Sequence, residues 1–482
     1  MNYTKSSLPF ALALPLPLAA AGQESAKPNI LVFIADDAGM DFGCYGNPNI
    51  RTPNVDRLAA QGLRFRNAYL TSPQSSPSRT SMMTGRFAHS IGTEDLHTPL
   101  NPGTQMIPSW LREAGYFSGS MLKTHWGPEG DKQFDRMIPA KYEQGDLNEE
   151  AFAHYSTFLD ESRGKPFFLW VGFTDPHRPY DRNLCPQVND PNSITPPPYL
   201  ADGPRTREDL ASYYDEISRM DGHIGRMLDI LRQKGMSRNT LIVFLSDNGM
   251  PFPRCKGSLY DSGIQTPLIF VWDGKIRPGS EHSNGLISAV DLAATFLDLA
   301  GIKPPQDMYG KSFAGLLADP SGRGREAIFA ERNWHDTDEY IRCVRTEKYK
   351  LIYNAYYHLP HGTAADLSSS PSWYELKEMQ RAGTIRCDQL QIFTAPRPMV
   401  ELYDLEVDPY ELNNIADVEM HVKAARQLAA QLVQWQKDTR DHPAWQRRRL
   451  DKNDRITGFP LFSEIPPLIP DCPSPANPQE AP

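Results

Sequence analysis

NILVFIA, residues 29–35, is followed directly by Asp36 and Asp37 and decides the fold class. Six of its seven residues are apolar, which is typical of a short strand buried on both faces of a sheet. Open α/β sheets bind ligands at the carboxyl ends of their strands, and paired oxygen ligands suit hard cations such as calcium. The stretch therefore predicts a central strand that ends at a metal site, although an Asp-Asp pair alone is more commonly a polar turn.

Apolar runs and helical patterns alternate along the chain beyond this strand. Further strands are expected at 63–68, 116–122, 167–173, 240–246 and 267–272, and helices at 53–61, 105–113, 206–235 and 288–300. This alternation predicts an α/β sandwich with a large, mostly parallel central sheet flanked by helices. Its crossover connections should be right-handed.

The composition becomes more polar after residue 325. Short strand patterns at 341–345, 349–353 and 401–405 precede a helical pattern at 418–439. They predict a smaller α+β subdomain with an antiparallel sheet. We expect a large catalytic domain at residues 27–324, this C-terminal subdomain at 325–457 and a proline-rich tail at 458–482.

The net charge and the N-terminal segment restrict the expected partners and the expected cellular location. The 482 residues include 50 basic and 59 acidic side chains, which give a net charge of −9 and no global positive field for nucleic acid. Residues 1–21 combine Lys5, an apolar run and a small-residue site at 19–21, as a secretory signal does. No later stretch is long and apolar enough for membrane insertion. We expect export, to a periplasm.

Six cysteines are scattered widely and show no metal-site spacing, at positions 44, 185, 255, 343, 387 and 472. One or two disulfides are compatible with an oxidising compartment, but the sequence does not pair them.

SSPSRTSMMTGR, residues 75–86, is the second informative stretch. Pro77 is tolerated in the first turn of a helix and Gly85 would stop it. Ser75 would then lie at a helix N-terminus, where backbone N–H groups and the helix dipole favour an anion. The alternative is a Ser/Thr-rich loop that only caps a helix.

Three more predicted strands end in polar residues. Lys123 and His125, two positions apart, could bind one anion. His177 lies between prolines, and histidine is a residue type that can act as an acid near neutral pH. Asp247 and Asn248 repeat the oxygen-ligand pattern of the first strand. Taken singly, these are more commonly solvated strand ends, loop residues and turns.

Together these motifs resemble those of the formylglycine-dependent sulfatases. The family signature Cys/Ser-x-Pro-x-Arg followed by Thr-Gly-Arg matches residues 75–86, Lys-x-His-x-Gly matches 123–127, and Pro-His-x-Pro matches 176–179. The resemblance runs from about residue 29 to 444, and 123–129 and 246–253 look closer to the heparan sulfamidases than to arylsulfatases. It implies an alkaline-phosphatase-like fold. This chain departs from the family in having Asp261-Ser262-Gly263 in place of Glu-Gly-Gly.

The resemblance also implies roles. A serine-type sulfatase-maturating enzyme would oxidise Ser75 to formylglycine, which would hold Ca²⁺ together with Asp36, Asp37, Asp247 and Asn248. Lys123, His177 and Lys256 would bind the sulfate, and Arg79 would help to offset its charge. For proton transfer, the family pattern assigns deprotonation of the nucleophile to Asp247, protonation of the leaving group to His177 and recovery of the aldehyde to His125.

Several functions are compatible with these residues. The first is a sulfamidase that removes N-sulfate from N-sulfoglucosamine of the heparan or heparin type, and the second is an O-sulfatase acting on another sulfated polysaccharide. A metal-dependent phosphoesterase or phosphonate hydrolase of the same fold, or a non-catalytic binder of sulfated glycans, are further alternatives.

Substrate specificity is expected in two loops rich in carboxylates and imidazoles, at 94–97 and 333–339. They make His97 and His335 the candidates for sugar binding, although exposed polar loops commonly serve only solvation.

Overall fold

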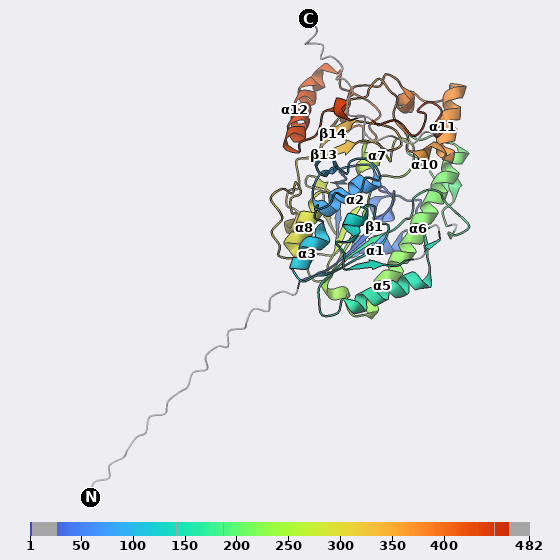
Figure 1. Ribbon diagram of the computed structural model, residues 1–482. Helices are drawn as coiled ribbons and strands as arrows, with labels where there is room; N and C mark the ends of the chain where they lie inside the picture. The colour runs from blue at the N-terminus through green and yellow to red at the C-terminus, as the bar shows by residue number, and fades with distance from the viewer. Residues whose placement is uncertain (2–26, 141, 144, 187, 448, 462–482) are drawn as a thin grey trace.

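The structure is a computed structural model that describes Met1 and residues 27–461 apart from 141, 144, 187 and 448 (Figure 1). Apart from Met1, the secretory signal predicted at residues 1–21 lies outside the described residues, as does the predicted tail from 462 onward. Within the described part, no helix combines the length and the apolar composition needed to span a bilayer.

An eight-stranded sheet forms the centre of the molecule, in the order β11-β2-β10-β9-β1-β8-β4-β5. Four adjacent strands run parallel to one another: β9 (Thr240–Ser246), β1 (Asn29–Ala35), β8 (Phe167–Gly172) and β4 (Phe117–Leu122). The outer strands are β11 (Ser280–His282), β2 (Leu63–Phe65), β10 (Leu268–Val271) and β5 (Arg136–Ile138). Only β10 is antiparallel to its neighbours, so the predicted mostly parallel sheet is confirmed.

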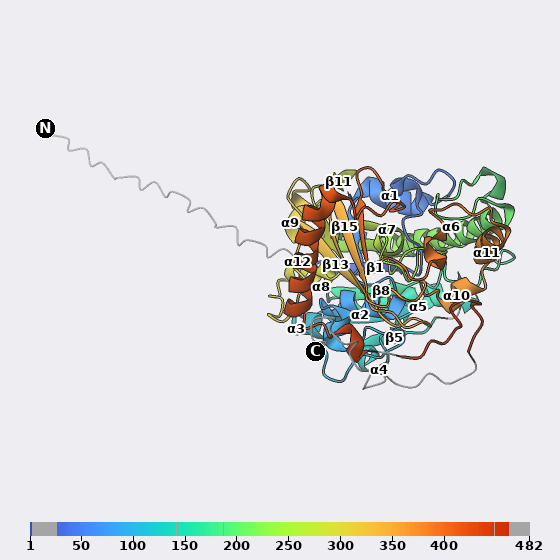
Figure 2. The ribbon, with the colours of Figure 1, turned by 90° about the horizontal axis from the view of Figure 1, so that it is seen from above.

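Helices cover both faces of this sheet (Figures 1 and 2). Leu31, Phe33 and Ala35 of β1 belong to the core under α1 (Pro53–Gln61), α5 (Glu149–Glu161) and α6 (Pro204–Gln233). The alternate residues Ile30, Val32 and Ile34 belong to the core under α2 (Ser75–Thr84), α3 (Ile107–Glu113), α8 (Asp291–Leu299) and α9 (Ala314–Ala318). Because both faces of β1 are buried, its sequence is apolar rather than alternating.

The remaining elements are short, apart from α11 with its 12 residues. They are β3 (Ala68–Tyr69), α4 (Pro128–Asp131), β6 (Tyr142–Glu143), β7 (Asp146–Leu147), α7 (Asp261–Ile264), β12 (Ile287–Ser288), α10 (Ala365–Ser368) and α11 (Pro371–Ala382).

Two predicted elements differ from the structure. The strand expected at 63–68 is divided into β2 and β3, which pair in different sheets. The helix expected from residue 288 begins only at Asp291, because Ile287 and Ser288 instead pair with β3.

Two long helices, α5 and α11, were not predicted. Helix α5 carries a recognisable start signal: the side chain of Asn148 accepts a hydrogen bond from the backbone N–H of Ala151, and Glu149 and Glu150 occupy the first turn. An Asn cap followed by acidic residues and apolar side chains at helical spacing marks a helix start.

The C-terminal subdomain contains the predicted antiparallel sheet, β13 (Ala327–Arg332), β14 (Ile341–Thr346), β15 (Tyr349–Asn354) and β16 (Val400–Asp404). Helix α12 (Val422–Asp438) packs on one face through Leu428, Leu432 and Trp435. The other face packs against Leu259, Tyr260 and Ile264, which precede and form α7. The domain boundary at 324–325 stays a prediction.

The five described cysteines are all free thiols, so no disulfide joins Cys44, Cys185, Cys255, Cys343 and Cys387. The sixth, Cys472, lies outside the described residues.

Candidate active site

Strands β9, β1, β8 and β4 of the large sheet end at one edge because they are parallel to one another. Asp36 and Asp37 follow β1, Lys123 and His125 follow β4, His177 follows β8, and Asp247 and Asn248 follow β9. The strand order places all these residues side by side, at the edge where open α/β sheets bind their ligands.

Three buried carboxylates meet there. Asp36, Asp37 and Asp247 are at most 1% exposed, and one oxygen from each lies within 4.8 Å of the others. The amide of Asn248 donates to Asp37 Oδ1 at 2.6 Å. Like charges this close are costly in a protein interior unless cations balance them.

Protein cations surround this acidic cluster. Lys123 pairs with Asp36, Lys256 Nζ lies 2.7 Å from Asp37 Oδ2, and Arg79 Nε lies 2.8 Å from Asp247 Oδ2. Arg79 Nη2 is buried without a hydrogen-bond partner among the described residues. An oxygen cluster rimmed by cations, one with an unused donor, fits a hard metal ion together with an anionic ligand.

Ser75 lies in the middle of this arrangement as the first residue of α2. It is 3% exposed, and its Oγ donates to Asp36 Oδ1 at 3.1 Å and lies 3.3 Å from Asn248 Oδ1. Lys123 Nζ is 3.4 Å from the same hydroxyl. Helix α2 thus begins two residues before the predicted start at Pro77 and presents Ser75 to the cluster.

The two aspartates that flank Ser75 and Arg79 differ in proton affinity. Burial raises the pKa of Asp247, and Asp36 and Asp37 add to this effect while Arg79 opposes it. Burial acts in the same direction on Asp36, but Lys123 and the other surrounding cations outweigh it and hold the pKa of Asp36 far below its usual range. Asp247 is therefore the better proton acceptor of the two.

His125 and His97 form an imidazole pair, with 2.7 Å between His97 Nδ1 and His125 Nε2. Burial lowers the pKa of both, that of His125 to about 2 with a further contribution from Lys123. Both rings are therefore neutral at pH 7. His125 Nδ1 is buried and has no hydrogen-bond partner among the described residues.

Lys256 connects the carboxylate cluster to Asp366, a residue that the sequence analysis did not identify. Its Nζ lies 2.7 Å from Asp37 Oδ2 and 2.7 Å from Asp366 Oδ2. His177 Nε2 lies 3.9 Å and 3.8 Å from the same two carboxylates. Asp366 comes from α10 in the C-terminal subdomain, and no local pattern marks it in the sequence.

The two predicted specificity loops lie close to these residues, but their acidic side chains are mostly engaged. His335 Nδ1 lies 2.9 Å from Asp336 Oδ2, and that oxygen also accepts from the N–H of Ala365 at 2.8 Å. Glu339 is fully buried in an ion pair with Arg397. The 333–339 loop therefore supports α10, and the Glu339 carboxylate is taken up by its ion pair with Arg397.

A cavity of about 230 Å³ opens beside the cluster, lined by Asp36, Lys123, Gly145, Thr174, Asp175, His177, Arg178 and Pro179. Backbone strain is concentrated around it: of eight described non-glycine residues with positive φ, five lie at or next to the site, namely Asp37, His97, Leu122, His125 and Asp336. Strained residues of this kind cluster at functional sites, because the surrounding structure must hold them in place.

Two family models match the chain. One, described as Sulfatase, covers residues 28–302, and the other, described as N-sulphoglucosamine sulphohydrolase, C-terminal, covers residues 255–380. The chain belongs to the sulfatase family. It is therefore a sulfuric ester or sulfamate hydrolase.

Individual proteins that are similar to this sulfatase are themselves named as sulfatases or sulphohydrolases. N-sulphoglucosamine sulphohydrolase of Homo sapiens is 30% identical over 89% of this chain and 95% of its own length. An ulvan-active sulfatase of Formosa agariphila is 29% identical over 85% of this chain and 74% of its own.

One solved structure, of a protein in complex with its substrate D-glucosamine-2-N,6-O-disulfate, superposes with a TM-score of 0.66 at 22% identity. The match covers 87% of this sulfatase and 99% of that chain. The predicted alkaline-phosphatase-like fold is confirmed.

Proposed function

We propose that this sulfatase removes the N-sulfate group of N-sulfoglucosamine in a saccharide of the heparan or heparin type. The observation that carries the proposal is the position of Asp366. It lies within the region that resembles the C-terminal part of N-sulphoglucosamine sulphohydrolase, and it reaches the Lys256 and His177 side chains at the end of the catalytic sheet.

The cofactor set of the family fits the residues present. Asp36, Asp37, Asp247 and Asn248 would hold Ca²⁺, and a formylglycine formed from Ser75 would be the fifth ligand. Bound together, these two groups supply a hydrated aldehyde as the nucleophile and a positive charge beside the sulfate. The maturation would depend on a serine-type sulfatase-maturating enzyme acting before the chain folds, because Ser75 is buried here.

The side chains around this position would bind the sulfate and move protons. Lys123, Lys256 and Arg79 would hold the sulfate oxygens and offset charge that develops during the reaction. Asp247, whose pKa burial raises, would accept the proton of the attacking hydroxyl. His125 Nδ1, which has no described partner, would accept the second proton at residue 75.

His177 would donate a proton to the leaving group. Its Nδ1 lies 2.6 Å from the carbonyl oxygen of Arg178, so Nδ1–H donates there. As the acid, the ring would also carry a proton on Nε2, which lies 3.8 Å from Asp366 Oδ2. A sulfamate nitrogen carries an N–H that a carboxylate can accept, whereas the oxygen of a sulfate ester has none. Asp366 therefore favours an amine as the leaving group over an alcohol.

An O-sulfatase remains the second candidate, because the ulvan-active relative is 29% identical over most of this chain. A two-metal phosphoesterase is less compatible with the site. Asp37, His177 and Asp366 do form a second group with metal-ligand spacing, but Lys256 Nζ lies 2.7 Å from both carboxylates. Lys256 therefore already balances the charge of both carboxylates in this group, which leaves less need for a second metal ion.

The test is sulfate release by protein that has been co-produced with a serine-type maturase and supplied with calcium. N-sulfoglucosamine is compared with a panel of O-sulfated monosaccharides and disaccharides. Intact mass checks maturation, because oxidation of serine to formylglycine removes about two mass units. Release from N-sulfoglucosamine supports the proposal, and release only from an O-sulfated sugar overturns the substrate while keeping the chemistry.

A further inference from the structure

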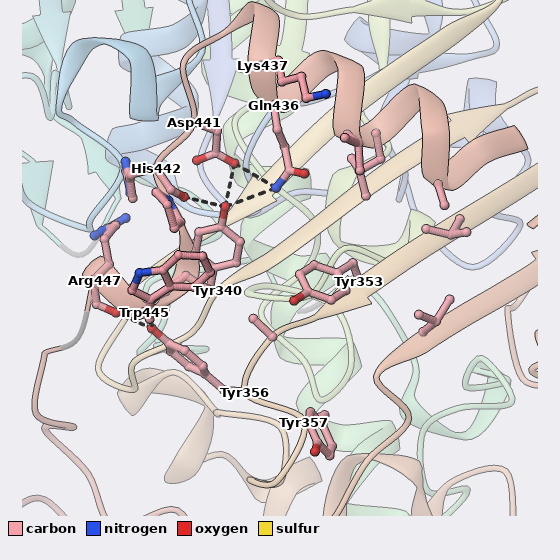
Figure 3. A pocket seen from close by; sticks show the side chains of 18 of the residues that line it. Tyr340, Tyr353, Tyr356, Tyr357, Gln436, Lys437, Asp441, His442, Trp445 and Arg447 are labelled. Atoms are coloured by element: carbon pink, nitrogen blue, oxygen red, sulfur yellow. Dashed lines mark hydrogen bonds between the residues drawn. The ribbon is translucent and has the colours of Figure 1, made fainter. Parts of the chain in front are cut away.

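A second and larger cavity, of about 910 Å³, lies on the C-terminal subdomain away from the strand ends (Figure 3). One wall is the exposed side of α12, with Gln436 and Lys437. The opposite wall includes Tyr353 of β15 and residues 355–358, and the segment 441–447 closes one end. We refer to this cavity as the aromatic pocket.

Five large aromatic side chains are part of its lining. Tyr340, Tyr353, Tyr356, Tyr357 and Trp445 all contribute, and Figure 3 shows them distributed from the α12 side to the far wall. Tyr357 is 41% exposed and Trp445 is 45% exposed, and both line the same cavity. An exposed aromatic patch bordered by polar groups marks a binding surface.

Hydrogen bonds fix the inner rings in place. The hydroxyl of Tyr340 lies 2.7 Å from the carbonyl oxygen of His442 and 2.9 Å from Asp441 Oδ2, and Gln436 Nε2 donates to it at 3.2 Å. The hydroxyl of Tyr356 donates to the carbonyl oxygen of Ala444 at 3.0 Å. Rings that are held before a ligand arrives cost little conformational entropy on binding.

The charge of the lining suits an anionic ligand. Asp441 is paired with Arg342 at 2.7 Å, and Arg447 is paired with Asp95. Lys437 is exposed and forms no ion pair with a described residue. In a protein with a net charge of −9, the pocket therefore offers an unbalanced cation next to a row of ring faces.

Arg447 connects the aromatic pocket to the 94–97 loop, which lies at the rim of the active site. The Tyr356 hydroxyl also donates to the carbonyl oxygen of Arg447, whose guanidinium pairs with Asp95 and lies 3.3 Å from Glu94. His97 follows in the same loop and contacts His125. A polymeric ligand held in the pocket would thus lie on the side of the molecule that carries this rim.

We infer that the aromatic pocket is a second binding site for a sulfated saccharide chain, separate from the site of sulfate removal. Sugar rings would place their C–H faces on Tyr357 and Trp445, and a sulfate or carboxylate of the chain would pair with Lys437. Holding the polymer there raises its effective concentration at the active site without any new contact to the scissile group. The inference rests on the proposed saccharide substrate.

The rival occupant is the tail of this chain. Residues 462–482 contain seven prolines, and aromatic grooves also bind proline-rich segments. The tail also carries Glu464, Asp471 and Glu480, so Lys437 could pair with either occupant. The saccharide is favoured because Tyr356 and Arg447 connect the pocket to the 94–97 loop beside the active site, where the enzyme's own sulfated substrate would bind. The tail is kept as an outcome of the test.

The test measures binding of a heparin-derived octasaccharide by calorimetry, in the Ser75→Ala background so that no ligand is consumed. Tyr357→Ala, Trp445→Ala and Lys437→Ala should each weaken binding by roughly fivefold. The matched controls Tyr374→Ala, which removes an equally exposed ring on α11 (43% exposed), and Lys423→Ala, on α12 outside the pocket lining, should leave the affinity unchanged.

Three results bear on the inference in different ways. Unchanged affinity in all three pocket variants, with melting temperatures equal to the parent, would overturn it. Binding of a synthetic 462–482 peptide to protein that lacks these residues, weakened by Tyr357→Ala and Trp445→Ala while octasaccharide binding is not, would assign the pocket to the tail and would also overturn it. Failure of the proposed function would give a different result, because matured protein would then release no sulfate from N-sulfoglucosamine. The binding measurement is made in the Ser75→Ala background and does not depend on that activity.

Discussion

Lys256 and Asp366 are joined by a 2.7 Å ion pair, although 110 residues separate them in the chain. The pair connects the loop after β9 of the catalytic sheet to α10 of the C-terminal subdomain, and the same Nζ also contacts Asp37. The C-terminal subdomain therefore contributes directly to the site, and Asp366 is the residue through which substrate choice can be tested.

Asp366→Asn should lower kcat/KM for N-sulfoglucosamine by about 10²-fold, because it removes the charged partner of Lys256 and leaves only a neutral amide oxygen to accept a sulfamate N–H. Hydrolysis of a generic aryl sulfate, which lacks that N–H, should fall much less. Glu378→Gln, a similar loss of charge at a 58% exposed side chain on α11, is the control. Equal losses on both substrates would show that Asp366 only positions Lys256.

Ser75→Ala should reduce sulfate release by at least about 10³-fold, since no aldehyde can form. The fold should persist, because the change removes one hydroxyl whose described hydrogen bonds are long, 3.1 Å to Asp36 and 3.3 Å to Asn248. Activity and thermal unfolding are measured side by side, and mass spectrometry should detect the loss of two hydrogens only in the parent. Residual release at a tenth of the parental rate would argue against formylglycine.

Removal of calcium should destabilise the protein as well as inactivate it. Without a cation, Asp36, Asp37 and Asp247 would keep oxygens within 4.8 Å of one another, with only the protein's own cations to balance them. A ligand present at 100 times its dissociation constant adds about 2.7 kcal/mol of stability. Chelation should thus lower the melting temperature by several degrees, and added Ca²⁺ should restore it.

Magnesium serves as the comparison in that experiment, because it requires a more regular octahedral site and keeps its water ligands. Asp37→Asn should lose the calcium response. A melting temperature that is insensitive to chelator and to added calcium would contradict the metal assignment.

The stability of the protein should depend on pH through His125. Burial lowers the pKa of this residue from 6.5 to about 2, so below pH 6.5 the unfolded chain binds a proton that the folded chain does not. The contribution of His125 to stability is therefore fully present above pH 6.5 and is lost progressively as the pH falls.

His125→Gln removes this titration while keeping a hydrogen-bonding side chain beside His97. Chemical unfolding at pH 7.5 and at pH 5 should show a smaller drop in stability for the variant than for the parent. The same drop in both proteins would mean that the acid sensitivity arises elsewhere, for example from the carboxylates.

The order of strands and helices could be predicted to within a few residues where burial leaves a clear pattern. Strands β1 and β9 match the predicted limits because apolar side chains fill both faces. The division of 63–68 into two strands and the late start of α8 could not be predicted, because pairing with distant segments decides both.

Local sequence determined which residue types stand at the strand ends: Asp36-Asp37, Lys123, His177 and Asp247-Asn248 each follow an apolar strand, and Ser75 begins a helix. Only the tertiary structure decided how these ends meet. The order β9-β1-β8-β4 brings them together, and α10 adds Asp366 from the other subdomain. Long-range pairing of this kind leaves no periodicity in either partner, so the ion pair between Lys256 and Asp366 and the pairing of His97 with His125 depend on the folded chain.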